Sequence, residues 1–184
     1  MIEIVNIVGS GDLVTELDLE ALESDLQTPF LEYDPTHYHG LYVRLETSGP
    51  LITVYRSGKY IISGCSSMAE LEETNENFLS KLGQLAIVSE SQSIDFNVEN
   101  VVCTSDLGDG ISLNTLTIGL GLESTEYEPE QFPGLIYRPN SVSAVLLVFA
   151  NGKVVITGSK DPKVAENAFS HLKSKIEDLG LDSE

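Results

Sequence analysis

The sequence contains the same hairpin pattern twice. One copy runs from Val54 to Gly64 and the other from Val148 to Gly158, with β-branched, aliphatic and aromatic residues flanking a central Gly-Lys. Ser57-Gly58 and Asn151-Gly152 are typical of two-residue hairpin turns, because glycine adopts positive φ without steric cost. The two copies are 148 − 54 = 94 residues apart. Each copy therefore predicts strand, two-residue turn, strand.

The offset of 94 holds along most of the chain without gaps. The matched residues include Asn6 and Asn100, Gly40 and Gly134, Arg44 and Arg138, Lys81 and Lys175, and Tyr33 and Pro35 with Tyr127 and Pro129. A register of this length predicts a duplicated structural unit. Because 184 residues fit one domain or two small ones, we expect residues 1–92 and 93–184 to be the two repeats of one continuous pseudo-twofold domain.

The charge of the chain is strongly negative. Its 29 acidic and 10 basic residues give a formal net charge of −19, and the acids are spread over both repeats. An evenly acidic surface is typical of proteins from a high-salt cytoplasm, although solubility alone can also explain it. On charge alone, nucleic acid is not an expected partner.

Several motifs are consistent with an intracellular protein without catalytic chemistry. Cys65 and Cys103 are isolated, so we expect both to be reduced. No apolar stretch approaches the length of a membrane span, and no signal peptide is visible, which predicts a cytoplasmic location. His37 and His39 lack a third ligand nearby, and residues 106–110 indicate a plain turn rather than a calcium loop. We therefore expect no metal, no cofactor and no enzymatic activity.

Hydrophobic periodicity predicts the same elements in each repeat. In the first, it indicates a strand over 2–10, a short helix over 17–26, a loop between Pro29 and Pro35, and strands over 40–46, 51–56 and 59–64. A helix over 68–83 follows, capped by Ser66 or Ser67, and the second repeat ends in a helix over 162–178. Two helices per repeat can cover only one face of the sheet, yet both faces are mostly apolar. This pattern favours a partner surface on the uncovered face, the alternative being a sandwich covered on both faces.

Four segments of the sequence resemble the TATA-box-binding protein family in its archaeal, two-repeat form. They are residues 4–8 (Ile-Val-Asn-Ile-Val), 57–64, 127–138 and 146–158, and the resemblance covers nearly the whole chain, more loosely in the first repeat. It implies an α+β fold, a saddle made of a curved, mostly antiparallel ten-stranded sheet with four helices on its convex face. It also implies a general transcription initiation factor, localised with the nucleoid, that binds and bends promoter DNA through the minor groove.

The resemblance further implies a role for particular residues. Tyr38 with Tyr55, and Phe132 with Phe149, would be wedge pairs, and Asn6 and Asn100 would hydrogen-bond base edges. The groove floor would contact Val8, Ile61, Val102, Leu147 and Val155, with the hydroxyls of Ser63 and Thr157, while Arg44, Arg56, Lys59, Arg138 and Lys153 would bind phosphates. Transcription factor B would contact Glu128, Glu130 and Gln131. The implied partners are A/T-rich double-stranded DNA, transcription factor B, the RNA polymerase assembly and, without DNA, a second copy paired through the concave face.

The chain departs from the family pattern at several positions, most of them in the first repeat. Tyr38 and Tyr55 stand where the family has phenylalanine, Thr53 and Gln131 replace leucines, and His39 replaces a small residue. The long helix of the first repeat is acidic where the family often carries bases. Two alternatives therefore stay open, a diverged paralogue with other promoters or partners and a protein-interaction scaffold that no longer binds DNA. The asparagines and aromatic residues would then be ordinary structural residues.

Overall fold

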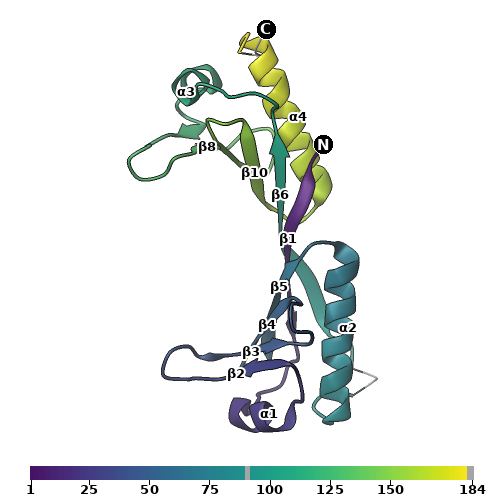
Figure 1. Ribbon diagram of the computed structural model, residues 1–184. Coiled ribbons are helices and arrows are strands. Elements are labelled where there is room, and N and C mark those ends of the chain that lie inside the picture. The colour runs from purple at the N-terminus through teal and green to yellow at the C-terminus, as the bar shows by residue number, and fades with distance from the viewer. Residues whose placement is uncertain (90–91, 182–184) are drawn as a thin grey trace. The chain divides into compact units, whose positions relative to one another are not determined.

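The protein consists of two successive β-α-β-β-β-β-α units, seen in a computed structural model that describes residues 1–89 and 92–181 (Figure 1). The first contains β1 (Glu3–Asp12), α1 (Leu19–Asp25), β2 (Phe30–Glu32), β3 (Gly40–Arg44), β4 (Leu51–Tyr55), β5 (Lys59–Cys65) and α2 (Met68–Gln84). The second contains β6 (Asp95–Asp106), α3 (Leu113–Leu120), β7 (Thr125–Glu126), β8 (Leu135–Tyr137), β9 (Val145–Val148), β10 (Lys153–Ser159) and α4 (Pro162–Asp178). None of the helices in the described part of the chain is long and apolar enough to cross a membrane.

The strands form one ten-stranded sheet in the order β2-β3-β4-β5-β1-β6-β10-β9-β8-β7. The neighbouring strands within each repeat are antiparallel. The α+β class, the ten-stranded sheet and the four helices expected from the sequence are thus confirmed for the described residues.

The chain divides into two compact units whose boundaries fall inside strands. One unit, here the Asn6–Glu99 unit, contains the first repeat without its first five residues, together with the beginning of β6. The other, here the Asn100–Glu184 unit, also includes Met1–Val5 at the beginning of β1. Each unit therefore completes its sheet with a few residues from the other repeat.

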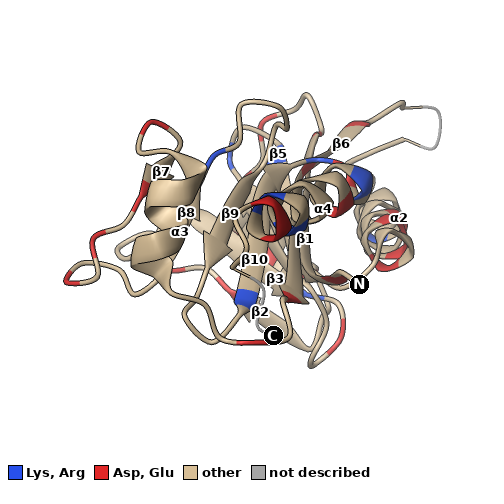
Figure 2. Ribbon diagram, turned by 90° about the horizontal axis from the view of Figure 1, so that it is seen from above, with Lys and Arg blue, Asp and Glu red and all other residues tan. Residues whose placement is uncertain are grey.

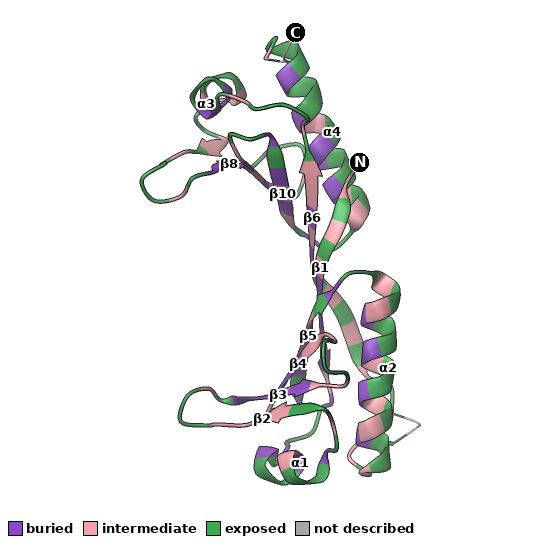
Figure 3. Ribbon diagram, in the orientation of Figure 1, coloured by how far each residue is buried: buried purple, intermediate pink, exposed green. Residues whose placement is uncertain are grey.

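Each long helix buries one stripe of side chains against the sheet of its unit (Figure 3). In α2 the stripe is Leu71, Thr74, Phe78 and Leu82, whereas Leu79 and Leu85, which helical periodicity would also place inward, are only half-buried. In α4 the stripe is Ala165, Ala168, Phe169, Leu172 and Ile176, and Val164, an apolar residue that the periodicity also favours as inward, is only half-buried. These stripes and the buried strand residues beneath them form the hydrophobic core of each unit.

Helix α2 begins at a double cap. The Ser67 hydroxyl accepts a hydrogen bond from the Glu70 N–H at 3.1 Å, and the Glu70 carboxylate accepts from the Ser66 N–H at 2.6 Å. These hydrogen bonds from the Ser66 backbone and hydroxyl lower the pKa of Glu70. Both candidate serines thus contribute, with Ser67 as the cap residue and Ser66 held by the reciprocal bond.

The two central hairpins have three-residue loops, so the prediction of two-residue turns is wrong. The Tyr55 carbonyl accepts from the Gly58 N–H at 2.9 Å, and Phe149 and Gly152 form the same bond at 2.9 Å. Gly58 and Gly152 have φ of 87° and 84°, as the last residue of a type I turn followed by a bulge requires. A Cβ at Gly58 would lie 2.2 Å from the Thr15 carbonyl oxygen, so the position excludes other residues.

Residues 30–32 form a strand where the sequence predicted only a loop. Strand β2 pairs with β3, with Phe30 opposite Arg44 and Glu32 opposite Tyr42. It is an edge strand of three residues, too short to show the alternation by which longer strands are recognised. It forms the edge of the sheet beside β3.

Candidate nucleic-acid interface

One face of the sheet in each unit carries no helix among the described residues (Figures 1 and 3). Buried and half-buried residues alternate along β5 and β10, because successive side chains point to opposite faces. The pairing register aligns Tyr42, Thr53, Ile61 and Ser10 across four strands of the Asn6–Glu99 unit. It aligns Ile136, Leu147, Val155 and Thr104 across the Asn100–Glu184 unit. We call this uncovered side the open face of each unit.

An asparagine with a fixed side-chain orientation lies on each open face. The Asn6 Oδ1 accepts a hydrogen bond from the Gly64 N–H at 2.8 Å, and the Asn100 Oδ1 accepts from the Gly158 N–H at 3.0 Å. Because a backbone donor occupies the oxygen, the Nδ2 of each amide is the donor left for other partners. Asn100 Nδ2 also donates to the Thr157 hydroxyl at 3.0 Å. Each open face therefore presents an oriented amide donor.

A pair of aromatic rings lies at the end of each open face. The Phe132 and Phe149 ring centroids are 5.8 Å apart with an interplanar angle of 64°, and those of Tyr38 and Tyr55 are 6.3 Å apart at 65°. Beneath each pair is a buried glycine, Gly40 or Gly134. A Cβ at either position would approach a ring carbon to 2.8 Å, so the ring pair requires glycine there.

The tyrosine pair belongs to a larger ring cluster, whereas the phenylalanine pair does not among the described contacts. The Tyr38 ring stacks on Tyr42 at 5.2 Å and 1°, and His39 lies 5.4 Å from Tyr55. The Tyr38 and Tyr55 hydroxyls are hydrogen-bonded at 2.8 Å. This bond, together with partial burial, raises the pKa of Tyr55 to about 12, so its hydroxyl is protonated at neutral pH. We call these four residues the tyrosine cluster.

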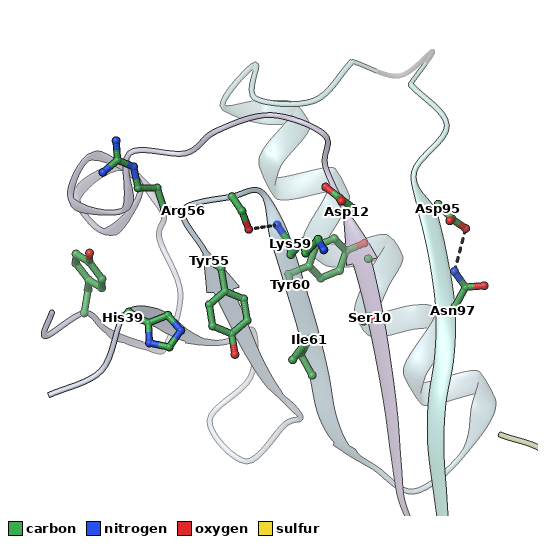
Figure 4. Close-up of a pocket in the computed structure, with 13 residues that line it drawn as sticks. Ser10, Asp12, His39, Tyr55, Arg56, Lys59, Tyr60, Ile61, Asp95 and Asn97 are labelled. Carbon is green, nitrogen blue, oxygen red and sulfur yellow. Dashed lines mark hydrogen bonds between the residues drawn. The ribbon is translucent and has the colours of Figure 1, made fainter. Parts of the chain in front are cut away.

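A cavity lies on the open face beside each ring pair, at matching positions of the repeat. The cavity of the Asn6–Glu99 unit has a volume of about 790 Å³ and is lined by Tyr55, Arg56, Lys59 and Ile61, among others (Figure 4). That of the Asn100–Glu184 unit, about 460 Å³, is lined by the matching Phe149, Lys153 and Val155. Both cavities combine an aromatic ring, a β-branched side chain and a lysine.

The basic residues expected to bind phosphates lie on or around these open faces. Arg56, Lys59 and Lys153 are exposed. Arg44 donates to the Gly49 carbonyl oxygen, and Arg138 forms an ion pair with Glu126 at 2.8 Å with both side chains largely exposed. In each repeat an aspartate, Asp12 or Asp106, is opposite the lysine in the strand register.

Acidic residues are abundant outside the open faces (Figure 2). The exposed side of α2 includes Glu72, Glu73 and Glu76. The loop between β7 and β8 exposes the three residues assigned to a protein partner, Glu128, Glu130 and Gln131.

The structure brings most of the predicted site residues of each repeat onto its open face. In the Asn6–Glu99 unit, Asn6, Val8, Tyr55, Ile61 and Ser63 belong to adjoining strands on that face. The matching set in the Asn100–Glu184 unit is Asn100, Val102, Leu147, Phe149, Val155 and Thr157. Sequence reasoning did not assign Ser10 and Tyr42 to this surface. Their even spacing from Val8 and Gly40 along alternating strands was the signal that would have found both.

The remaining polar candidates have structural explanations. His37 Nδ1 lies 2.7 Å from Asp34 Oδ2, and both groups are exposed. No group of three or more His, Cys, Asp or Glu residues in residues 1–89 and 92–181 has the geometry of a metal site. Cys65 and Cys103 are buried free thiols whose pKa values are raised by burial. The Asp106 side chain accepts from the Gly108 N–H at 2.8 Å, which is a plain aspartate turn.

The duplicated α+β fold with helices on one face of its sheet defines a class of two-repeat proteins. Comparison with known proteins assigns the chain to a family of this class. The model of the family "Transcription factor TFIID (or TATA-binding protein, TBP)" matches twice, over residues 1–85 and 95–179. The chain belongs to this family, and its role is that of a transcription initiation factor. Members of the family are transcription factors rather than enzymes.

Similar proteins come from halophilic archaea. TATA-box-binding protein C of Halobacterium salinarum is 65% identical over 178 residues, covering 97% of this chain and 98% of the relative. TATA-box-binding protein 1 of Haloferax volcanii is 41% identical over 180 residues, covering 98% and 94%. Among solved structures, Methanococcus jannaschii TBP superposes with a TM-score of 0.80 at 35% identity, covering 96% of this chain and 98% of that one.

Proposed function

We propose that this protein binds A/T-rich promoter DNA in the minor groove through the open faces of both units. The observation that carries the proposal is the pair of oriented amides, Asn6 and Asn100. Their oxygens are occupied by the N–H groups of Gly64 and Gly158, at 2.8 and 3.0 Å, which leaves Nδ2 donors on the open face. In the minor groove, A·T pairs present only acceptors, so an oriented donor matches them and a carboxylate would be repelled.

The half-buried apolar residues between the asparagines and the ring pairs fit the floor of the groove. Val8 and Ile61 in one unit, and Val102 and Val155 in the other, are neither buried in the core nor fully exposed. Leu147 adds apolar surface in the Asn100–Glu184 unit, while Ser63 and Thr157 add hydroxyls. Burying these side chains against sugars and base edges removes apolar surface from water, which favours binding without requiring net positive charge.

The ring pairs would act as wedges that bend the DNA. Phe132 with Phe149, and Tyr38 with Tyr55, present half-buried rings at the ends of the open faces. Such rings can enter a partly unstacked base step and kink the duplex, a mechanism for which the TATA-binding protein family is itself the reference example. A bend of this kind would bring phosphates towards the basic residues around the open faces.

Five basic residues would neutralise those phosphates. Arg56, Lys59 and Lys153 are exposed, and Arg44 and Arg138 form local contacts that a phosphate can replace or share. Since the chain has only 10 basic residues, placing five of them here concentrates positive charge where an acidic protein needs it.

The same proposal includes protein partners and two repeats that act on one duplex. The exposed loop with Glu128, Glu130 and Gln131 would bind transcription factor B, which in turn would recruit RNA polymerase to chromosomal DNA in the cytoplasm. Residues 1–92 and 93–184 would act as one pseudo-twofold body. Without DNA, the apolar open faces of two copies would pair with each other.

A mobility-shift assay in molar KCl would test the proposal. The probes are an A/T-box duplex and a scrambled duplex, each with and without transcription factor B, and circularly permuted probes report bending. Asn6→Asp combined with Asn100→Asp is the matched negative variant, because each aspartate can still accept the glycine N–H. We expect a bent binary complex and a ternary complex with the wild type only. Binding of transcription factor B without any DNA complex would contradict the proposal and favour the interaction scaffold.

A further inference from the structure

The two ring pairs have nearly the same geometry and different chemistry. The ring centroids are 6.3 Å apart in the tyrosine pair and 5.8 Å apart in the phenylalanine pair, and the interplanar angles are 65° and 64°. The phenylalanine pair presents only hydrocarbon. The tyrosine pair presents two hydroxyl groups, held to each other at 2.8 Å. Tyr38 is further supported by its stack on Tyr42, whose matching residue in the other repeat is Ile136.

The hydroxyl pair has unsatisfied hydrogen-bonding capacity that a ligand would have to meet. Two hydroxyls have two O–H donors and four acceptor lone pairs. Their mutual bond uses one donor and one lone pair, which leaves one donor and three lone pairs. Both tyrosines are half-buried, so water reaches them in the free protein. A bound duplex would displace that water, and a hydroxyl buried without a partner is costly.

The two kinds of base pair differ in what they offer these groups. An A·T pair presents only acceptors in the minor groove, so it can satisfy the O–H donor but none of the lone pairs. A G·C pair adds the guanine amino group as a donor. That amino group can donate to a tyrosine oxygen while the remaining O–H donates to an acceptor of the same base pair. The phenylalanine pair has no hydrogen-bond acceptor for the added amino group.

We propose that the tyrosine cluster reads a G·C pair at the edge of the binding site and thereby sets the orientation of the protein on DNA. This inference rests on the minor-groove binding proposed above. A molecule built from two similar repeats can bind a nearly symmetric A/T box in either direction. A single edge that accepts guanine, opposite an edge that does not, makes the two directions unequal.

The orientation can be measured with a pair of matched attachment sites. Ser80 in α2 and Ser174 in α4 are exposed, and they are related by the same offset of 94 residues. Ser80→Cys and Ser174→Cys, each carrying an iron-chelate cleavage reagent, would cut the DNA near one unit or the other. Cys65 and Cys103 are buried, so the protein without either substitution controls for background labelling. The probe is an A/T box with one G·C pair placed at either end.

We expect the Ser80→Cys protein to cut the DNA about three- to ten-fold more often near the G·C end than near the other end of the box. This ratio corresponds to the free energy of one net hydrogen bond. Ser174→Cys should give the opposite pattern. Adding Tyr38→Phe with Tyr55→Phe should abolish the preference, and an unchanged midpoint of thermal unfolding would show that the variant is folded. Adding Phe132→Tyr with Phe149→Tyr should also abolish it, because both edges would then accept guanine.

The possible failures of the two proposals are distinguishable. Tight binding to the A/T box with equal cutting at both ends would overturn the orientation proposal and leave minor-groove binding standing. A preference that survives Tyr38→Phe with Tyr55→Phe would assign the orientation to other residues and also overturn it. Absence of binding to every duplex would overturn minor-groove binding itself, and the orientation proposal with it.

Discussion

The Asn6–Glu99 and Asn100–Glu184 units share the same order of helices and strands and differ in the side chains that pack between them. In the first, Tyr60 is fully buried and its hydroxyl donates to Asn75 at 2.6 Å. The matching residues of the second unit are Val154 and Phe169, a small residue on the strand and a large one on the helix. The large side chain is thus on the strand in the first unit and on the helix in the second, and only the first unit needs a hydrogen bond at this position.

The open faces show the same kind of exchange. Tyrosines in one unit replace phenylalanines in the other at almost unchanged ring geometry, and the glycine beneath the rings is present in both. The comparison shows that repetition preserves the volumes and close approaches on which packing depends. Polarity can change at such a position wherever a neighbouring group supplies the hydrogen bond, as Asn75 and Tyr38 do here.

The largest effect is expected for Asn100→Asp. The new carboxylate can still accept the Gly158 N–H, so the fold should persist, but the Nδ2 donor is lost and a charge that acceptors and phosphates repel is added. We expect the free energy of DNA binding to weaken by about 3 kcal/mol, near the upper end for an unpaired buried polar group. Isothermal titration would measure it, with Asn6→Asp as the matched variant. An unchanged dissociation constant would place Asn100 away from the groove.

Phe149→Ala should weaken binding by about 2 kcal/mol, a typical value for loss of one aromatic side chain stacked on a base. It should also reduce the bend seen with permuted probes, because the ring would hold the base step open. The comparison variant is Tyr55→Phe, which on a pure A/T box should be neutral or bind slightly better, since a buried hydroxyl loses water. If Tyr55→Phe abolished binding to that box, the hydroxyl would be making a specific bond to an A·T pair.

Asn75→Ala tests the exchange in the core. It removes the acceptor of the fully buried Tyr60 hydroxyl, so the free energy of unfolding should fall by about 2 kcal/mol. Urea denaturation would measure this loss. The double variant Tyr60→Phe with Asn75→Ala should recover part of it, because no hydroxyl is then left unpaired. Equal losses for the single and double variants would show that packing, rather than the hydrogen bond, determines stability here.

Glu128→Arg should affect the partner and leave DNA binding nearly intact. The residue is exposed in the loop between β7 and β8. Reversing its charge should weaken the ternary complex with transcription factor B by about 1 kcal/mol, the scale of an exposed ion pair. Ternary mobility shifts at fixed DNA would detect this change. Normal recruitment combined with loss of binary DNA binding would refute the assignment of this loop to a protein partner.

The smallest effect on DNA affinity is expected from a change in salt concentration. The five proposed phosphate contacts would release cations from DNA, but a chain of net charge −19 would take up cations to approach a polyanion. These tendencies oppose each other, and salts excluded from apolar surface favour burial of the open faces. We expect affinity for an A/T box to stay flat or rise between about 0.2 and 1 M KCl, by titration calorimetry, in place of the usual steep fall. A steep negative slope would mean that the basic residues outweigh the acidic surface.

Several features of this protein were determined by its sequence alone. The offset of 94 residues, the α+β class and the two helices per repeat are visible because they depend on local periodicity and on internal repetition. The final helix was predicted over 162–178 and is observed over Pro162–Asp178, since Asp161 caps it and proline suits its first turn. The choice of open-face residues followed from the resemblance together with the two-residue period of strands.

Other features were decided only by the tertiary structure. The hairpin loops have three residues, with Gly58 at positive φ where a Cβ would lie 2.2 Å from the Thr15 carbonyl oxygen, and β2 forms because β3 lies beside it. The orientation of Asn6 depends on a glycine 58 residues further along the chain. The hydroxyl bond between Tyr38 and Tyr55 likewise joins residues from a loop and a strand end. Each of these contacts involves groups distant in sequence, whose meeting depends on long-range strand pairing that no local pattern records.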